Sequence, residues 1–136
     1  MSSAGYSGTP LPRKLGIREG DAVAIVDDPG HAAELLAPLP AGVTTTGDAG
    51  QADVVLFFTT ARDTLAHRIE ELAGAIFPDR ALWVAWPKRA SGVPTDMTED
   101  VVREVALPLG LVDNKVCAID ATWSGLRLVW RRERRP

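Results

Sequence analysis

Charged and hydroxyl-bearing side chains follow four short apolar runs of this sequence. The runs cover residues 22–26, 54–58, 81–86 and 116–119. The polar residues after them that have side chains suited to chemistry are Asp27, Thr60, Arg62, Lys88, Ser91, Asp120 and Ser124. Arginine and lysine can bind a phosphate or carboxylate group, and a carboxylate can act as a general base. The set therefore predicts a site that binds an anion or moves a proton.

The four apolar runs predict the strands that would bring these residues together. Each run is continuous and bounded by turn residues, which is typical of a parallel strand buried on both faces. We expect all four to lie side by side in one sheet, so that their carboxyl ends meet at one edge. At that edge, Lys88 should reach Arg62 or the segment 120–124. The other possibility is that Arg62 and Lys88 form surface salt bridges with nearby carboxylates.

Helical patterns separate the predicted strands. Asp28 suits the start of a helix that ends near Ala37. Thr60 should cap a second helix, whose apolar stripe includes Ile69. Thr98, followed by two acidic residues, should cap a third. Strands and helices therefore alternate along most of the chain.

This alternation predicts the fold class. It indicates an α/β protein: a single three-layer, Rossmann-like domain with a mostly parallel sheet and a C-terminal antiparallel hairpin strand. Apolar residues alternate with arginines in 126–131, so we expect the last strand to be antiparallel and near an edge of the sheet. The domain should cover residues 1–136, with an irregular segment at 1–12 and a basic tail at 131–136.

The turn after the first strand bears on the choice of cofactor. The segment 15–23 (LGIREGDAV) resembles the approach to the first strand of class I methyltransferases, and the terminal hairpin fits their topology. The resemblance implies a shared fold only, because this turn has the sequence DDPGH and lacks the glycine-rich turn that holds S-adenosylmethionine. It does not suit NAD either, since Pro29 has no N–H for a phosphate. With no P-loop and no zinc-ligand spacing, we expect no cofactor and no metal.

Composition indicates which partners and which cell compartment to expect. The 136 residues carry 15 Lys and Arg against 18 Asp and Glu, for a net charge of -3. This acidic balance argues against nucleic acid as a partner, although the tail 131–135 is basic. Cys117 is the single cysteine and lies in an apolar run, so we expect a buried, inert thiol. We find no apolar stretch that would span a membrane and no secretory signal, and expect a cytoplasmic protein.

Six segments together resemble one protein family. They are GYSGTPL (5–11), KLGI (14–17), WPK (86–88), TD (95–96), GLVDNKVCA (110–118) and WSGL (123–126). They resemble a family of small, largely actinobacterial proteins that is known only as a domain of unknown function. The resemblance covers nearly the whole chain, and WPK and WSGL are its most specific parts. It implies a stand-alone cytoplasmic domain and assigns no catalytic residue.

The residues favour a non-catalytic binding or regulatory protein over an enzyme. Basic groups gather at the predicted edge without a positioned acid–base or nucleophile pair. In this hypothesis Arg62, Lys88, Ser91 and Asp120 hold a small anionic ligand or an acidic protein partner. The alternative is a small transferase-like or hydrolase-like enzyme, in which Asp27 or Asp120 is the general base and Lys88 fixes an anion. The oligomeric state is left open.

Overall fold

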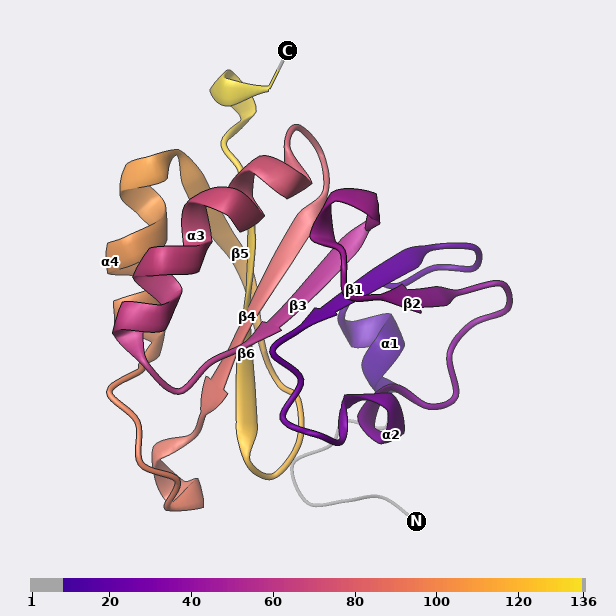
Figure 1. Cartoon of the computed structure of the whole chain (residues 1–136), viewed down its shortest axis with the longest axis horizontal. Coiled ribbons are helices and arrows are strands. Elements are labelled where there is room, and N and C mark those ends of the chain that lie inside the picture. Colours follow the sequence, from indigo (N-terminus) through magenta and orange to yellow (C-terminus); the bar gives the residue numbers. More distant parts are fainter. Residues whose placement is uncertain (1–8, 136) are drawn as a thin grey trace.

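The structure, a computed structural model, describes residues 9–135. In this part of the chain, six strands form one sheet with helices on both faces, which confirms the predicted fold class (Figure 1). The strands are β1 (Ala22–Val26), β2 (Thr44–Thr46), β3 (Val54–Phe58), β4 (Ala81–Pro87), β5 (Leu111–Ala118) and β6 (Trp123–Trp130). The α-helices are α1 (Leu11–Lys14), α2 (Ala32–Leu36), α3 (Arg62–Ile76) and α4 (Glu99–Ala106).

The strand order is β2-β1-β3-β4-β6-β5. The first four strands are parallel, and β6 runs antiparallel between β4 and β5. The prediction for the last strand is confirmed, since β6 is antiparallel and lies next to the edge strand. One prediction is wrong: the run 116–119 is not adjacent to the other three runs and pairs with β6 alone. The physical reason is burial. Leu126 and Leu128 of β6 are buried in the core, whereas Lys115 and Val116 of β5 are exposed.

Both edges of the sheet are irregular or short. The register of β5 against β6 shifts at a bulge between Asp113 and Lys115. The neighbouring side chains Asn114, Lys115 and Val116 are exposed. At the opposite edge, β2 is three threonines long.

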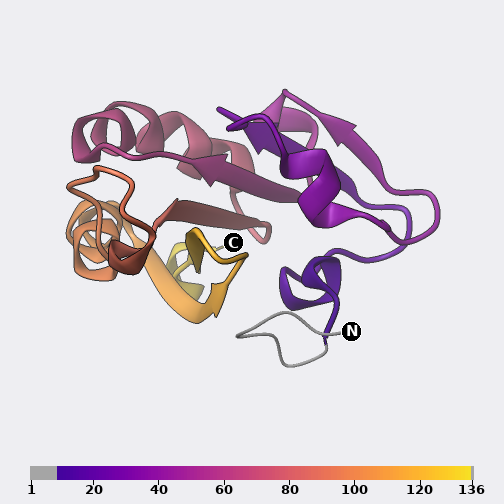
Figure 2. The ribbon, with the colours of Figure 1, turned by 90° about the horizontal axis from the view of Figure 1, so that it is seen from below.

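Helices of very different length cover the two faces of the sheet. The thick face is covered by α3, of 15 residues, and by α4, of eight. The thin face is covered by α1, of four residues, by α2, of five, and by the segment that includes Leu15 and Ile17. Figure 2 shows α3 and α4 together on one side, and α1 and α2 together on the other. Buried strand side chains alternate between the two cores, with Val55 and Phe57 facing the thick side and Leu56 and Phe58 the thin side.

Local contacts decide where α3 begins. Its first residue is Arg62, whose backbone N–H donates to Asp96 Oδ1 at 2.8 Å. The predicted cap by Thr60 is therefore wrong, because a carboxylate from the segment before α4 takes that role. The predicted stripe is confirmed: Ile69 is 2% exposed, and Glu70 is exposed.

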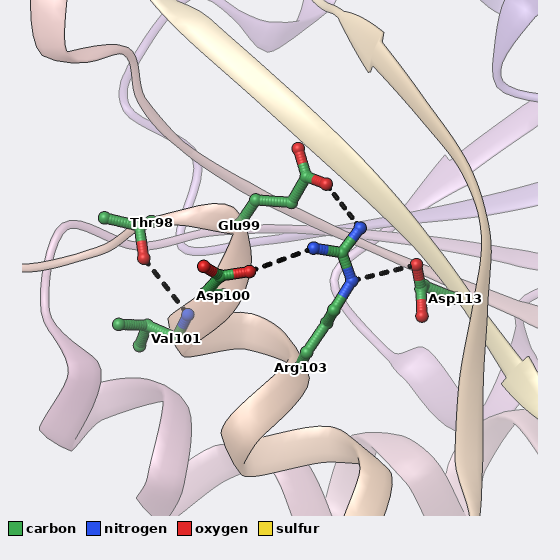
Figure 3. A network of polar contacts seen from close by, with 6 residues as sticks. All are labelled: Thr98, Glu99, Asp100, Val101, Arg103 and Asp113. Carbon is green, nitrogen blue, oxygen red and sulfur yellow. Dashed lines mark hydrogen bonds and ion pairs between the residues drawn. The ribbon is translucent and has the colours of Figure 1, made fainter.

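Thr98 and Arg103 hold α4 in place (Figure 3). Thr98 Oγ1 accepts a backbone N–H of the first turn at 3.1 Å, which confirms the predicted cap. Arg103 Nε donates to Asp113 Oδ2 of β5 at 3.1 Å, and its other nitrogens donate to Glu99 and Asp100. The bonds to Glu99 and Asp113 raise the pKa of the Arg103 guanidinium. This network joins α4 to the edge strand β5.

Within the described residues, both segments that were predicted to be irregular or a tail contain a helical turn. The predicted irregular segment 1–12 lies mostly outside the described residues, but α1 covers Leu11 and Pro12. In the predicted tail, residues Arg132–Arg134 form a 3-10 turn, and the Arg131 N–H donates to the Gly110 carbonyl at 2.9 Å. Among residues 9–135, no helix combines the length and the apolar character needed to cross a membrane.

Candidate functional site

The carboxyl ends of β1, β3 and β4 lie at one edge of the sheet, because these strands are parallel neighbours. The turn between β5 and β6 lies at the same edge, since β6 begins there and runs antiparallel to β4. We call this region the carboxyl edge; it comprises residues 27–31, 59–62, 87–91 and 119–124. All of the predicted site residues lie on it.

Lys88 connects β4 to the turn between β5 and β6. Its Nζ donates to the carbonyl oxygen of Asp120 at 2.8 Å, and its backbone N–H donates to the carbonyl of Thr122 at 2.7 Å. The predicted reach of Lys88 to the segment 120–124 is therefore confirmed. Ser91 Oγ donates to the Lys88 carbonyl at 2.7 Å, so this hydroxyl holds the loop. Within residues 9–135, no polar contact joins Lys88 to Arg62.

Asp120 is fixed by the backbone of its own turn and faces a histidine. Its Oδ1 accepts the N–H groups of Thr122 at 2.8 Å and Trp123 at 2.7 Å. Its Oδ2 lies 3.4 Å from Nε2 of His31. The Asp120 side chain is 17% exposed and that of His31 is 37% exposed. The pair therefore joins a well-held carboxylate to an imidazole that solvent and ligands can reach.

Sequence reasoning missed His31 as a partner of Asp120. It considered this histidine only as a metal ligand, because no residue near it in the sequence marks another role. The useful signal was its place in the turn after a buried strand, since the carboxyl ends of neighbouring strands share one edge. Among the described residues, no group of His, Cys, Asp and Glu side chains could hold a metal ion.

In the turn after β1, a carboxylate of the turn itself accepts hydrogen bonds from the backbone N–H groups. Asp28 Oδ1 accepts the N–H of Gly30 at 2.7 Å and that of Ala32 at 3.2 Å. Pro29 has no N–H to offer. Helix α2 starts at Ala32, later than predicted, and ends at Leu36. The N–H groups at this turn are therefore already occupied by a negative charge.

Asp27 and Arg62 both form partly exposed ion pairs. Asp27 has a left-handed backbone, with φ of 55°, and its Oδ2 lies 3.3 Å from Nη1 of Arg68. Arg62 Nη2 lies 3.7 Å from Glu104 Oε1, where both side chains are more than half exposed. Exposed pairs of this kind are weak, so a ligand can compete for either charged group.

An open groove lies beside the carboxyl end of β4. It has a volume of about 710 Å³ and is lined by Trp86, Lys88 and Ser124 and by residues 92–99. Val93 and Pro94 are exposed and give the groove an apolar surface, whereas Trp86 and Met97 are buried. Thr95 Oγ1 donates to the Thr60 carbonyl at 2.6 Å, so Thr60 contributes a backbone contact that holds this wall. The dimensions suit a small molecule or a protruding side chain.

Several solved structures with a fold similar to this chain are of methyltransferases. A protein of Sulfolobus solfataricus assigned to the type 11 methyltransferases matches with a TM-score of 0.62 and 16% identity, over 89% of each chain. The N-methyltransferase NodS of Bradyrhizobium japonicum matches with 0.56 and 14%, over 90% of this chain and 93% of its own. The magnesium protoporphyrin IX methyltransferase of Synechocystis, with bound S-adenosylmethionine, matches with 0.55 and 14%, over 89% and 74%. No protein-family model and no curated protein matches the chain.

These matches confirm the shared fold that the segment 15–23 and the terminal hairpin indicated. They also correct the functional hypothesis. The expected non-catalytic binding or regulatory protein is wrong, because the structural neighbours are group-transfer enzymes. The finding agrees better with the alternative, a small transferase-like or hydrolase-like enzyme.

Proposed function

We propose that this chain is a small methyltransferase whose reaction takes place at the carboxyl edge. The observation that carries the proposal is the strand order, with β6 antiparallel between β4 and β5, in a chain that a methyltransferase structure matches over 89% of its length. In open α/β sheets, ligands bind beyond the carboxyl ends of the parallel strands. The side chains at that edge then indicate which methyl donor and which kind of methyl acceptor the site suits.

The charge of the turn after β1 supports S-adenosylmethionine as the methyl donor, the ligand of the Synechocystis neighbour. When bound, this donor supplies a methyl group attached to a positively charged sulfur. Asp27 and Asp28 place two exposed carboxylates at this turn, which attract a cation and repel a phosphate. Since the N–H groups of Gly30 and Ala32 are occupied by Asp28, they are not free for the donor's own carboxylate. The turn after β1 therefore fits S-adenosylmethionine through its negative charge and not through free N–H groups.

His31 is the residue that we propose to accept a proton from the methyl acceptor. Its Nε2 faces the Asp120 carboxylate at 3.4 Å, which leaves Nδ1 for the proton. Asp120 is held by two backbone N–H groups, so its negative charge stays beside the imidazole as that ring becomes positive. Asp120 then acts as a positioning residue, and the base is His31 rather than the carboxylate predicted from the sequence.

The groove beside β4 supports an acceptor of modest size. Val93 and Pro94 offer apolar contact, and Ser124 offers a hydroxyl on the same surface. The Lys88 ammonium is bonded to the Asp120 carbonyl, so it orders the turn that carries Asp120. An acceptor with an N–H or O–H group on an apolar frame fits these contacts best.

Equilibrium binding tests the donor site directly. Isothermal titration calorimetry with the full chain should show that S-adenosylmethionine binds more tightly than S-adenosylhomocysteine, because only the former carries the sulfonium charge. Asp27→Asn should reduce this preference at least about fivefold, since it removes one carboxylate from the turn. Asparagine tolerates the left-handed backbone of residue 27, so the variant should fold.

Glu70→Gln is the matched control, because it removes an exposed carboxylate from α3 away from the edge. It should leave both affinities unchanged. The proposal fails if neither compound binds the wild-type chain, or if Asp27→Asn and Glu70→Gln behave alike. His31→Gln should keep donor binding and lose methyl transfer to an acceptor found in a cell extract, followed with donor labelled in its methyl group.

A further inference from the structure

A pocket at the opposite edge of the sheet gathers three arginines. It has a volume of about 410 Å³, and its cationic lining residues are Arg18, Arg80 and Arg127. The starts of β3 and β4 also line it, so it lies at the amino edge, across the sheet from the candidate active site. We call it the arginine pocket. The methyltransferase proposal gives it no role.

Arg127 is the least expected of these side chains, because it belongs to a strand inside the sheet. It lies directly opposite Trp83 in the ladder between β4 and β6, and Trp83 is fully buried in the thin-face core. Residues opposite each other in such a ladder point to the same face. Arg127 is thus half-buried beside an aromatic core residue. Burial, together with the nearby Arg18, lowers the pKa of the Arg127 guanidinium.

The three guanidinium groups have no polar partner among the residues that the structure describes. Within residues 9–135, none of them forms a hydrogen bond or an ion pair through its side chain; the ion pairs use His31, Arg62, Arg68 and Arg103 instead. Three carboxylates line the same pocket, but two are bonded to backbone N–H groups. Asp21 accepts from Arg18 N at 2.9 Å and Asp53 from Ala22 N at 2.8 Å. Three guanidinium groups that line one pocket without protein partners among the described residues are available to an anion.

A second basic pocket adjoins the first. It has a volume of about 290 Å³, shares Gly16 and Arg127 with the arginine pocket, and is otherwise lined by Arg13, Lys14, Asn114 and Lys115. Lys14 Nζ donates to the Ala118 carbonyl at 3.1 Å, and Lys115 Nζ to the Lys14 carbonyl at 2.7 Å. The Lys115 ammonium has further N–H groups to offer. Together the two pockets place six cationic side chains against three carboxylates, in a chain whose net charge is -3.

We propose that these adjoining pockets bind a diphosphate group, with Arg127 between its two phosphates. The planar guanidinium of arginine matches phosphate oxygens in pairs. Arg18 and Arg80 would hold one phosphate, and Lys115 the other. The two pockets at a shared arginine favour two linked anionic groups over one. The ligand is therefore an inorganic or nucleoside diphosphate.

Pyrophosphate binding to the full chain, measured by isothermal titration calorimetry at low salt, tests the proposal. Arg127→Met should weaken binding by about tenfold or more, because charge-assisted hydrogen bonds to phosphate are lost. The same variant should keep or raise the melting temperature of the unliganded chain, since it removes an unpaired, half-buried charge. A merely structural role for Arg127 would lower that temperature.

Arg132→Met is the control, because Arg132 is exposed in the C-terminal 3-10 turn; it should bind pyrophosphate as the wild type does. Arg18→Gln, a change at an exposed position, should weaken binding even if Arg127→Met folds poorly. Inorganic phosphate should bind less tightly than pyrophosphate, since it fills one pocket. If ADP binds at least as tightly as pyrophosphate, the ligand is a nucleoside diphosphate. If ADP binds more weakly, the ligand is inorganic diphosphate.

The proposal is overturned if pyrophosphate does not bind, if phosphate binds as tightly, or if Arg127→Met and Arg132→Met are indistinguishable. The donor-binding experiment at the carboxyl edge uses other residues and another ligand, so either proposal can fail while the other stands.

Discussion

The thick and thin faces of the sheet bury their strands by different means. On the thick face, α3 lays Leu65, Ile69 and Leu72 over the sheet at helical spacing. On the thin face, helices of four and five residues cannot present such a stripe. Aromatic packing replaces it, as in the edge-to-face contact of Phe58 and Trp123 at 5.1 Å between ring centroids.

The comparison shows that a face covered by short helices can hold a charged side chain beside its core. The thin face holds Trp83 by one hydrogen bond from its Nε1 to the Leu15 carbonyl, at 2.9 Å. Beside it, Arg127 points from an interior strand without a protein partner. On the thick face, in contrast, the guanidinium of Arg103 lies in a network of three carboxylates (Figure 3). One face is therefore completed by protein groups, and the other is open to a ligand.

The largest effect is expected on the thick face. Ile69→Ala removes a fully packed side chain of the α3 stripe and should lower the free energy of unfolding by about 2–5 kcal/mol. Chemical denaturation measures the loss. Glu70→Ala, at the next and exposed position, should cost about 0.5 kcal/mol or less. Equal losses in the two variants would show that α3 does not pack as described.

A smaller loss is expected where one hydrogen bond fastens the thin face. Trp83→Phe keeps an aromatic ring but leaves the buried Leu15 carbonyl without its donor, which should cost about 1–3 kcal/mol. Trp130→Phe removes a similar bond, from Nε1 to the Ala73 carbonyl at 2.8 Å. Trp130 is only half-buried, so water can replace that bond and the loss should be smaller. Denaturant midpoints that reverse this order would contradict the comparison.

Gly125 tests how tightly the thin face is filled. A Cβ at this position would lie 2.9 Å from Ile119 Cδ1 and 3.1 Å from Trp83 Cε3. Gly125→Ala should therefore destabilise the chain by about 1–2 kcal/mol through overpacking. Gly74→Ala, in α3, meets no atom within 4 Å and should stabilise by about 0.5–1 kcal/mol. Thermal melts measure both variants. A raised melting temperature for both would mean that the thin-face core is not tightly packed at Gly125.

The smallest effect concerns the thiol that packs against the thin-face core. Burial raises the pKa of Cys117 above its ordinary value, so less thiolate is present near pH 8. Iodoacetamide should alkylate the folded chain more slowly than the urea-unfolded chain, and the difference should shrink as pH rises through the raised pKa. The stability that comes from the neutral thiol is complete below the ordinary pKa and is lost above the raised one. Equal rates at pH 8 would contradict this burial.

The sequence was sufficient for elements whose signal is local. The runs that form β1, β3 and β4 are continuously apolar, and the α3 stripe repeats at helical spacing, so both could be predicted. The order of β5 and β6 could not, because either strand of a hairpin can pair with β4. The cap of α3 was missed for a similar reason, since Asp96 reaches Arg62 from a distant segment.

The candidate site also has parts that the sequence predicted and parts that it did not. Lys88 and the segment 120–124 could be placed together, because Pro87 ends one strand and the carboxyl ends of neighbouring strands share an edge. His31 and the arginine pocket could not, since both depend on how turns and strands meet in space. Arg127 in particular follows an alternating pattern that is typical of a solvated face, and the structure half-buries it.

The edges of the sheet determine how the chain behaves beside its own copies. An exposed, regular edge strand offers a row of N–H and C=O groups to which another chain can add, and this route leads to aggregation. The bulge between Asp113 and Lys115 interrupts that row on β5, where Lys115 also adds an exposed charge. At the far edge, β2 offers only three residues. Neither edge presents a long template, so the fold resists strand-by-strand growth into fibres even at high concentration.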